Sequence, residues 1–127
     1  MHIVEIFGRI FLSAVFLIAG VNKIFNHEGT TAYMEGFGVP GSLYIPAIIL
    51  EILFPLLIVI GYQTKISALI MAIFSISLAI IFHTDFSNQM QVMSFLKNFA
   101  IAGGFIIIFV NGPGRWSIDY ILKSKTT

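Results

Sequence analysis

The sequence contains no cysteine and very little charge: 57% of its 127 residues are hydrophobic and 10% are charged. The absence of cysteine excludes a disulfide relay, thiolate-ligated iron–sulfur clusters and persulfide chemistry within this chain. The formal charge of +1 gives no reason to expect nucleic-acid binding, which needs clustered lysine and arginine. This composition differs from that of an ordinary soluble domain and favours a membrane protein.

Four continuous apolar segments are long enough to cross a bilayer as helices. They cover about residues 3–24, 43–62, 66–82 and 95–110. Continuous runs favour helices, because the strands of a membrane barrel would alternate in polarity. Only Gln63–Lys65 separates the second segment from the third, which forces an antiparallel hairpin. We therefore expect an all-α fold, an integral membrane four-helix bundle formed by residues 1–127 as a single domain.

Two further segments are predicted to form short interfacial helices at the membrane surface. Residues 26–42 contain Tyr33 and Phe37 but are interrupted by glycine and proline, which indicates a short helix followed by a turn. Residues 115–125 follow a Gly-Pro-Gly break and combine aromatic with basic side chains. That combination is typical of a segment lying on an anionic leaflet.

Lysine and arginine are distributed unequally between the two predicted sides of the membrane. If the N-terminus is inside, the inner side holds Arg9, Lys65, Arg115, Lys123 and Lys125, and the outer side holds Lys23 and Lys97. The positive-inside rule then places both termini in the cytoplasm.

Glu51 lies inside the second apolar segment, where a carboxylate is costly. Its insertion costs roughly 2.5–3.5 kcal/mol, so the side chain should face a partner, a cavity or a pathway. A rise of about 1.5 Å per residue places it roughly 10 Å below the outer surface. We expect either a functional role, such as proton transfer, or a structural pair with Lys23 or Lys97. The sequence leaves both alternatives open.

Helix depth divides the polar residues into two clusters. The outer cluster contains Asn22, Lys23, Glu51, His83, Asp85, Lys97 and Asn98, and the inner cluster contains Glu5, Arg9, Arg115 and Asp119. Arg9 is expected to form a structural ion pair within the inner cluster, because a direct bond to Glu51 would have to span an axial gap of roughly 10 Å. The candidate catalytic residues are Glu51 and His83, and the candidate binding residues are Lys23, Asn22, Lys97 and Asn98.

Each outer residue also has a purely structural interpretation. Lys23 and Lys97 can anchor helix ends at the interface, and Asn98 can donate an interhelical hydrogen bond. His83 and Asp85 offer two metal ligands, and His27 lies on the same side, but no further ligand has a compelling position. We therefore expect neither a metal site nor a haem site.

In their order and spacing, these residues resemble the DoxX family of small four-helix integral membrane proteins. The matching stretches are GRIFLSAVFLIAGVNK at 8–23, GVP at 38–40, residues 51–61, His83, and residues 97–104 and 112–119. The resemblance covers nearly the whole chain and implies a multi-pass protein of a prokaryotic cytoplasmic (inner) membrane. It also implies a link, known for some members, to thiosulfate oxidation with quinone reduction or to membrane oxidoreductase complexes. The family positions carried over are Arg9, Lys23, Glu51, His83 and Lys97.

Three functions are compatible with the sequence. The first is a redox-associated subunit that binds a quinone or small anion near the outer leaflet, with a partner or bound cofactor to carry electrons. The second is a non-catalytic assembly or anchoring subunit whose buried ion pairs fix helix register. The third is a small transporter built from several copies of the chain. The expected partners are therefore the lipid bilayer, a quinone or small anion, and a partner subunit or further copies. Quinone is the one cofactor that these functions suggest.

Overall fold

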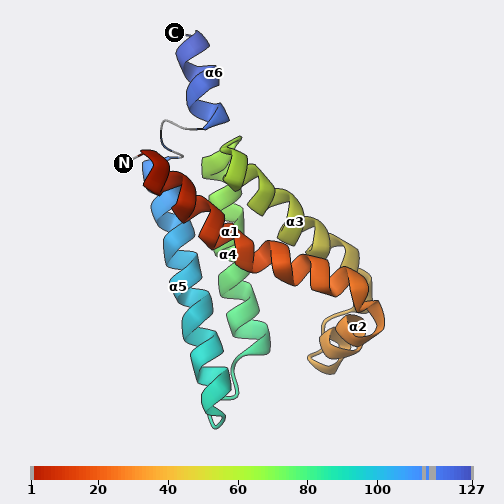
Figure 1. The fold of residues 1–127 in the computed structure, drawn as a ribbon. Helices are drawn as coiled ribbons and strands as arrows, with labels where there is room; N and C mark the ends of the chain where they lie inside the picture. Colours follow the sequence, from red (N-terminus) through yellow and green to blue (C-terminus); the bar gives the residue numbers. More distant parts are fainter. Residues whose placement is uncertain (1, 113, 115–116, 127) are drawn as a thin grey trace.

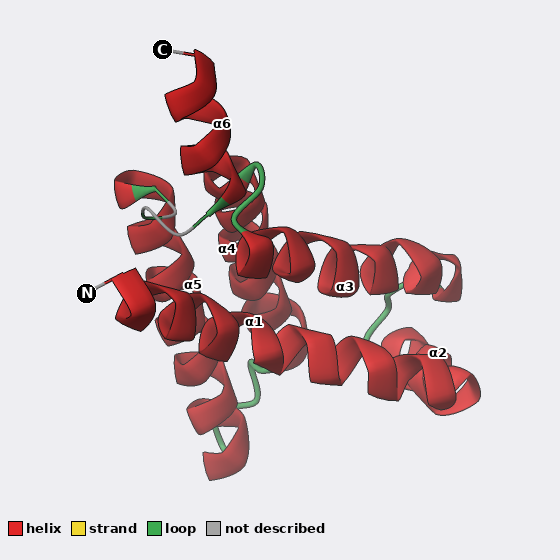
Figure 2. Cartoon of the chain, turned by 45° about the horizontal axis from the view of Figure 1, so that its top comes forward, coloured by secondary structure: helices red, strands yellow, loops and turns green. Residues whose placement is uncertain are grey.

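The structure is a computed structural model that describes residues 2–112, 114 and 117–126 (Figure 1). Within these ranges every regular element is a helix and there is no strand, which confirms the all-α fold class (Figure 2). The elements are α1 (His2–Phe25), α2 (His27–Gly36), the 3-10 helix η1 (Gly41–Leu43), α3 (Tyr44–Ile60), α4 (Thr64–Phe82), α5 (Gln89–Asn111) and α6 (Ile118–Thr126).

Four helical stretches in the described ranges are long and apolar enough to cross a membrane: Ile3–Phe25, Gly41–Ile60, Thr64–Phe82 and Gln89–Asn111. Large apolar side chains remain exposed along all of them, as contact with lipid requires. The last stretch begins at Gln89, ahead of the predicted start at residue 95. The side chain of Asn88 accepts a hydrogen bond from the Met90 amide at 2.9 Å and so caps α5. Hydropathy alone missed this start because the first turns of α5 are partly polar.

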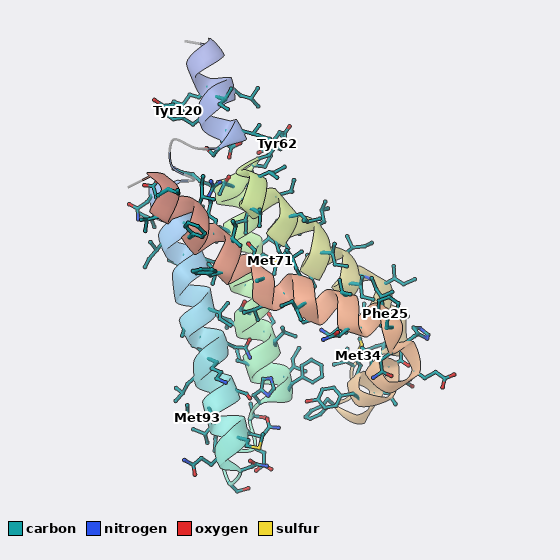
Figure 3. All side chains as sticks on the ribbon, viewed as in Figure 1. Phe25, Met34, Tyr62, Met71, Met93 and Tyr120 are labelled. Carbon is teal, nitrogen blue, oxygen red and sulfur yellow. The ribbon has the colours of Figure 1, made fainter. Side chains whose placement is uncertain are left out.

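The long helices form two pairs, α1 with α3 and α4 with α5, and a short turn joins α3 to α4. The pairs lie together near that turn and diverge toward α2 (Figures 1 and 2). The core fills the region where the pairs cross and consists of Phe16, Ile58, Ala68, Met71, Ala72, Ala102 and Phe105. Met71 marks this crossing of α1 over α4 (Figure 3). The packed core therefore leaves the diverging end open for a pocket.

Gly61 ends α3 in the left-handed conformation, with a φ of 78°. Its amide donates to the Leu57 carbonyl at 2.8 Å, and its carbonyl accepts from the Asp119 amide at 2.8 Å. A Cβ atom here would overlap the side chains of Arg9 and Ser117. Both the backbone conformation and the crowded surroundings therefore require glycine at the α3–α4 turn.

The tail is attached to this same turn through Asp119. The two carboxylate oxygens of Asp119 accept hydrogen bonds from the amides of Gln63 and Thr64, each at 2.8 Å. A carboxylate at a helix N-terminus satisfies amides that have no partner inside the helix. Asp119 thus caps α4 from a distant part of the chain, and α6 extends from there away from the long helices (Figure 1).

Candidate functional site

A pocket of about 440 Å³ lies between the diverging helix pairs, with walls from α1, α2, α3 and α4 and one residue of α5. Most of its wall is apolar, formed by side chains such as Phe16, Met34, Leu50, Phe74 and Leu78. Four residues of the predicted outer cluster also line it: Lys23, Glu51, His83 and Asn98. The volume falls in the range of about 300–1,000 Å³ that small-molecule sites occupy.

The most buried polar group of the pocket is the carboxylate of Glu51, whose side chain is 1% exposed. The ammonium group of Lys23 donates a hydrogen bond to Glu51 Oε1 and forms an ion pair that joins α1 to α3. Glu51 Oε2, in contrast, has no hydrogen-bond partner in the part of the chain that the structure describes. The pair therefore leaves one buried carboxylate oxygen with unused capacity to accept a hydrogen bond.

Local packing explains how Lys23 and Glu51 meet. Gly20 lies one turn before Lys23 on α1, and a Cβ atom there would stand 2.8 Å from Ile52 Cγ1. The missing side chain lets the two helices approach closely at Glu51. At the end of α1, the Tyr44 hydroxyl donates to the Lys23 carbonyl at 2.5 Å. This bond fixes the start of α3 beside the end of α1.

His83 lies at the end of α4, on the rim of the pocket. Its Nδ1 is 2.9 Å from the side-chain carbonyl oxygen of Gln91. In the neutral tautomer that carries its proton on Nδ1, the imidazole donates to this oxygen and Nε2 is an acceptor. Asn98 donates from Nδ2 to the Ser94 carbonyl at 3.1 Å within its own helix. Asn98 therefore forms a hydrogen bond within α5.

The structure does not bring the whole predicted outer cluster together. Asn22 and Lys97 are exposed and do not line the pocket, so Lys23 rather than Lys97 is the partner of Glu51. The carboxylate of Asp85 accepts from the hydroxyl and amide of Ser87 in its own turn. Among the described residues, no group of three or more histidine and carboxylate side chains is placed to hold a metal ion.

An aromatic contact that the sequence did not predict joins the end of α4 to α2, and one of its rings, Phe82, lines the pocket. The ring of Phe82, at the end of α4, stacks on Tyr33 of α2 with centroids 5.4 Å apart. It also meets Phe37 edge to face at 5.1 Å, and Tyr33 lies 5.0 Å from Phe37. We call Tyr33, Phe37 and Phe82 the aromatic clasp. The position of Phe82 directly before the candidate residue His83 was a possible signal in the sequence. Nothing in the sequence indicated that Phe82 contacts α2.

The inner cluster lies around Arg9, which is 4% exposed. Its Nη1 donates to the Ile58 carbonyl at 3.3 Å, and the charges of Glu5 and Asp119 act on its guanidinium. Arg115, the fourth predicted member, lies outside the described residues. Arg9 and Glu51 therefore have different partners.

These features define a small polytopic helical membrane protein with a partly buried ion pair at the wall of an apolar pocket. The DoxX family profile matches residues 5–84, a range that holds Arg9, Lys23, Glu51 and His83. The chain belongs to the DoxX family, as its motifs predicted.

Two relatives from Escherichia coli (strain K12) match over most of their length. The chain is 39% identical over 118 residues to "Inner membrane protein YqjF", covering 93% of this chain and 91% of the relative. It is 31% identical over 119 residues to "Inner membrane protein YphA", covering 88% of this chain and 85% of the relative. No solved structure matches the chain at a significant level.

Proposed function

We propose that this chain is a quinone-linked, redox-associated membrane subunit that binds a lipophilic molecule with a polar head in the Lys23–Glu51 pocket. The observation that carries the proposal is an apolar pocket of about 440 Å³ with a partly buried ion pair at its wall. Apolar walls suit a ring and tail, and a few convergent polar groups suit the orientation of one head group.

The rim of the pocket supports entry from the bilayer. Val15, Leu43 and Ile81 line it and are 49%, 47% and 42% exposed. These side chains belong to the apolar outer surface of helices long enough to cross a membrane. A lipophilic molecule can therefore pass between lipid and pocket without crossing water.

The polar groups of the pocket suit hydrogen bonding and proton exchange with a polar head group. Glu51 and His83 each offer an acceptor, and Lys23 offers donors to an oxygen of the ligand. Electrons would pass to a partner or bound cofactor, since no side chain of this sequence carries them by itself. In this proposal the pocket lies in the outer half of an inner membrane, with both chain termini in the cytoplasm.

Mass spectrometry of lipids and quinones that co-purify with the protein tests this function. Wild type should retain quinone or its hydroquinone, and Glu51→Gln should change the amount retained per folded protein, because the substitution replaces the carboxylate of the pocket with an amide. Glu28→Gln is the matched control, since Glu28 is exposed on α2 and does not line the pocket. Wild-type protein that neither retains quinone nor alters quinone reduction in membranes would contradict the proposal.

A second candidate is an assembly or anchoring subunit, favoured by the fact that the Lys23–Glu51 pair also joins α1 to α3. In that case Glu51→Gln should lower stability or impair assembly of a complex, while the amount of bound quinone per folded protein stays unchanged. The ratio of quinone to folded protein therefore distinguishes the two functions.

A further inference from the structure

We propose that the pocket selects lipophilic molecules whose neutral polar head carries a hydroxyl group, as in an alcohol, a phenol or a hydroquinone. Heads that only accept hydrogen bonds, such as ethers and quinones, should bind more weakly. This inference rests on the ligand-binding part of the proposed function and specifies the chemistry of the head.

Glu51 has an unused hydrogen-bond acceptor in the pocket wall. The side chain is 1% exposed, and Oε2 has no hydrogen-bond partner among residues 2–112, 114 and 117–126. Its neighbours on the pocket wall, Ala47 and Leu50, have no side-chain donor. A buried acceptor without a partner is costly, most of all when it carries charge. A ligand that donates a hydrogen bond to Oε2 removes that cost.

Lys23 places hydrogen-bond donors beside this acceptor. An ammonium group has three N–H donors, and the contact with Glu51 Oε1 uses one of them. The Lys23 side chain is 31% exposed and lines the same pocket. Because its ammonium group lies beside the carboxylate, one hydroxyl group can accept from Lys23 and donate to Glu51 Oε2. A hydroxyl is the smallest neutral group that does both.

Other heads satisfy only half of this arrangement. A carbonyl or ether oxygen accepts from Lys23 but leaves Glu51 Oε2 without a donor. An anion is attracted by Lys23 but repelled by Glu51, and a cation is attracted by Glu51 but repelled by Lys23. Since a hydrogen bond to a buried charged group is worth more than one between neutral groups, the hydroxyl should improve affinity roughly ten- to hundredfold.

A matched pair of probes tests the inference directly: para-nonylphenol and its methyl ether. They share the ring and the tail, and the ether carries a methyl group in place of the hydroxyl hydrogen. Their affinities for the full chain in nanodiscs are measured and corrected for partition into empty nanodiscs. Wild type and Glu28→Gln should bind the phenol at least about tenfold more tightly than the ether. In Glu51→Gln the preference should vanish or reverse, because the new amide can donate to the ether oxygen.

The outcomes separate this inference from the proposed function. Equal affinity of wild type for phenol and ether overturns the hydroxyl selection and leaves ligand binding intact. Failure to bind either probe, or a quinone, overturns both. If Glu51→Gln does not fold, the wild-type ratio decides alone, and a hydroquinone with its quinone provides a second pair that tests the same preference.

Discussion

Gly20 of α1 lies directly against Glu51 of α3: a Cβ atom at Gly20 would stand 3.4 Å from the Cβ of Glu51 and closer still to Ile52. Because Gly20 has no side chain, α1 and α3 approach closely at this point. The residue of α3 at this point is Glu51, which carries a buried carboxylate. The ion pair between Lys23 and Glu51 depends on this contact.

A valine at Gly20 should separate α1 from α3 and destabilise the protein. Overpacking of a close contact costs about 1–3 kcal/mol. Thermal unfolding in detergent should show a lower Tm for Gly20→Val than for Gly8→Val, because a Cβ at Gly8 on the same helix meets nothing within 4 Å. Equal losses in both variants would mean that helix propensity, and not the contact with α3, determines the result.

Removal of one member of the ion pair should cost more than removal of both. Lys23→Met leaves the buried carboxylate of Glu51 without its counter-charge, which typically costs about 3–5 kcal/mol. The double variant Lys23→Met with Glu51→Gln should regain most of that loss, because neither charge remains. Unfolding of the two single variants and the double variant measures the coupling. Strictly additive losses would show that the pair contributes nothing to stability.

Asp119→Ala should loosen the start of α4 without disturbing the pocket. The substitution removes the carboxylate that accepts from the Gln63 and Thr64 amides, and loss of such a cap costs about 0.5–2 kcal/mol. Hydrogen exchange should become faster at these two amides. Asp85→Ala is the control, since the carboxylate of Asp85 bonds within its own turn. Unchanged exchange at Thr64 in Asp119→Ala would be inconsistent with the capping role.

Phe82→Ala should open the aromatic clasp. Each ring pair contributes about 0.5–1.5 kcal/mol beyond its buried area, so α2 should lose much of its attachment to α4. We expect faster hydrogen exchange over α2 and faster release of any bound quinone. Phe25→Ala provides the control, because Phe25 is 85% exposed. The role of the clasp would be refuted by release rates that match those of wild type.

Both termini should be cytoplasmic in the proposed orientation. We expect a signal from a reporter that is fused after Thr127 and is active only in the cytoplasm. A reporter fused at the same point that is active only in the periplasm should give no signal. The reverse pattern would invert the assignment and move the pocket to the inner half of the membrane.

The sequence predicted the helices well because each long helix is a continuous apolar run whose length the bilayer fixes. It also separated Arg9 from Glu51, since depth along a helix follows from the rise per residue. Depth does not reveal rotation about the helix axis. That is why Lys23 and Lys97 remained equal candidates for Glu51, and why Asn22 and Lys97 were grouped with residues that line the pocket.

Contacts between segments far apart in the sequence were harder to foresee. Asp119 was placed near Arg9 by charge, but its hydrogen bonds to the Gln63 and Thr64 amides depend on where the tail returns to the turn. The aromatic clasp likewise depends on how α2 folds back toward α4. Neither contact has a signature in local spacing or hydropathy.

The turn at Gly61 and the aromatic clasp hold opposite ends of the molecule with very different strength. At the Gly61 end, Asp119 donates from its amide to the Gly61 carbonyl at the end of α3 and accepts from the Thr64 amide at the start of α4, so it joins the two helix pairs by directional hydrogen bonds. At the other end, the contact of α2 with α4 includes three aromatic rings, whose interactions are less directional. We therefore expect any widening of the pocket to begin at the contact between α2 and α4 and not at the Gly61 turn.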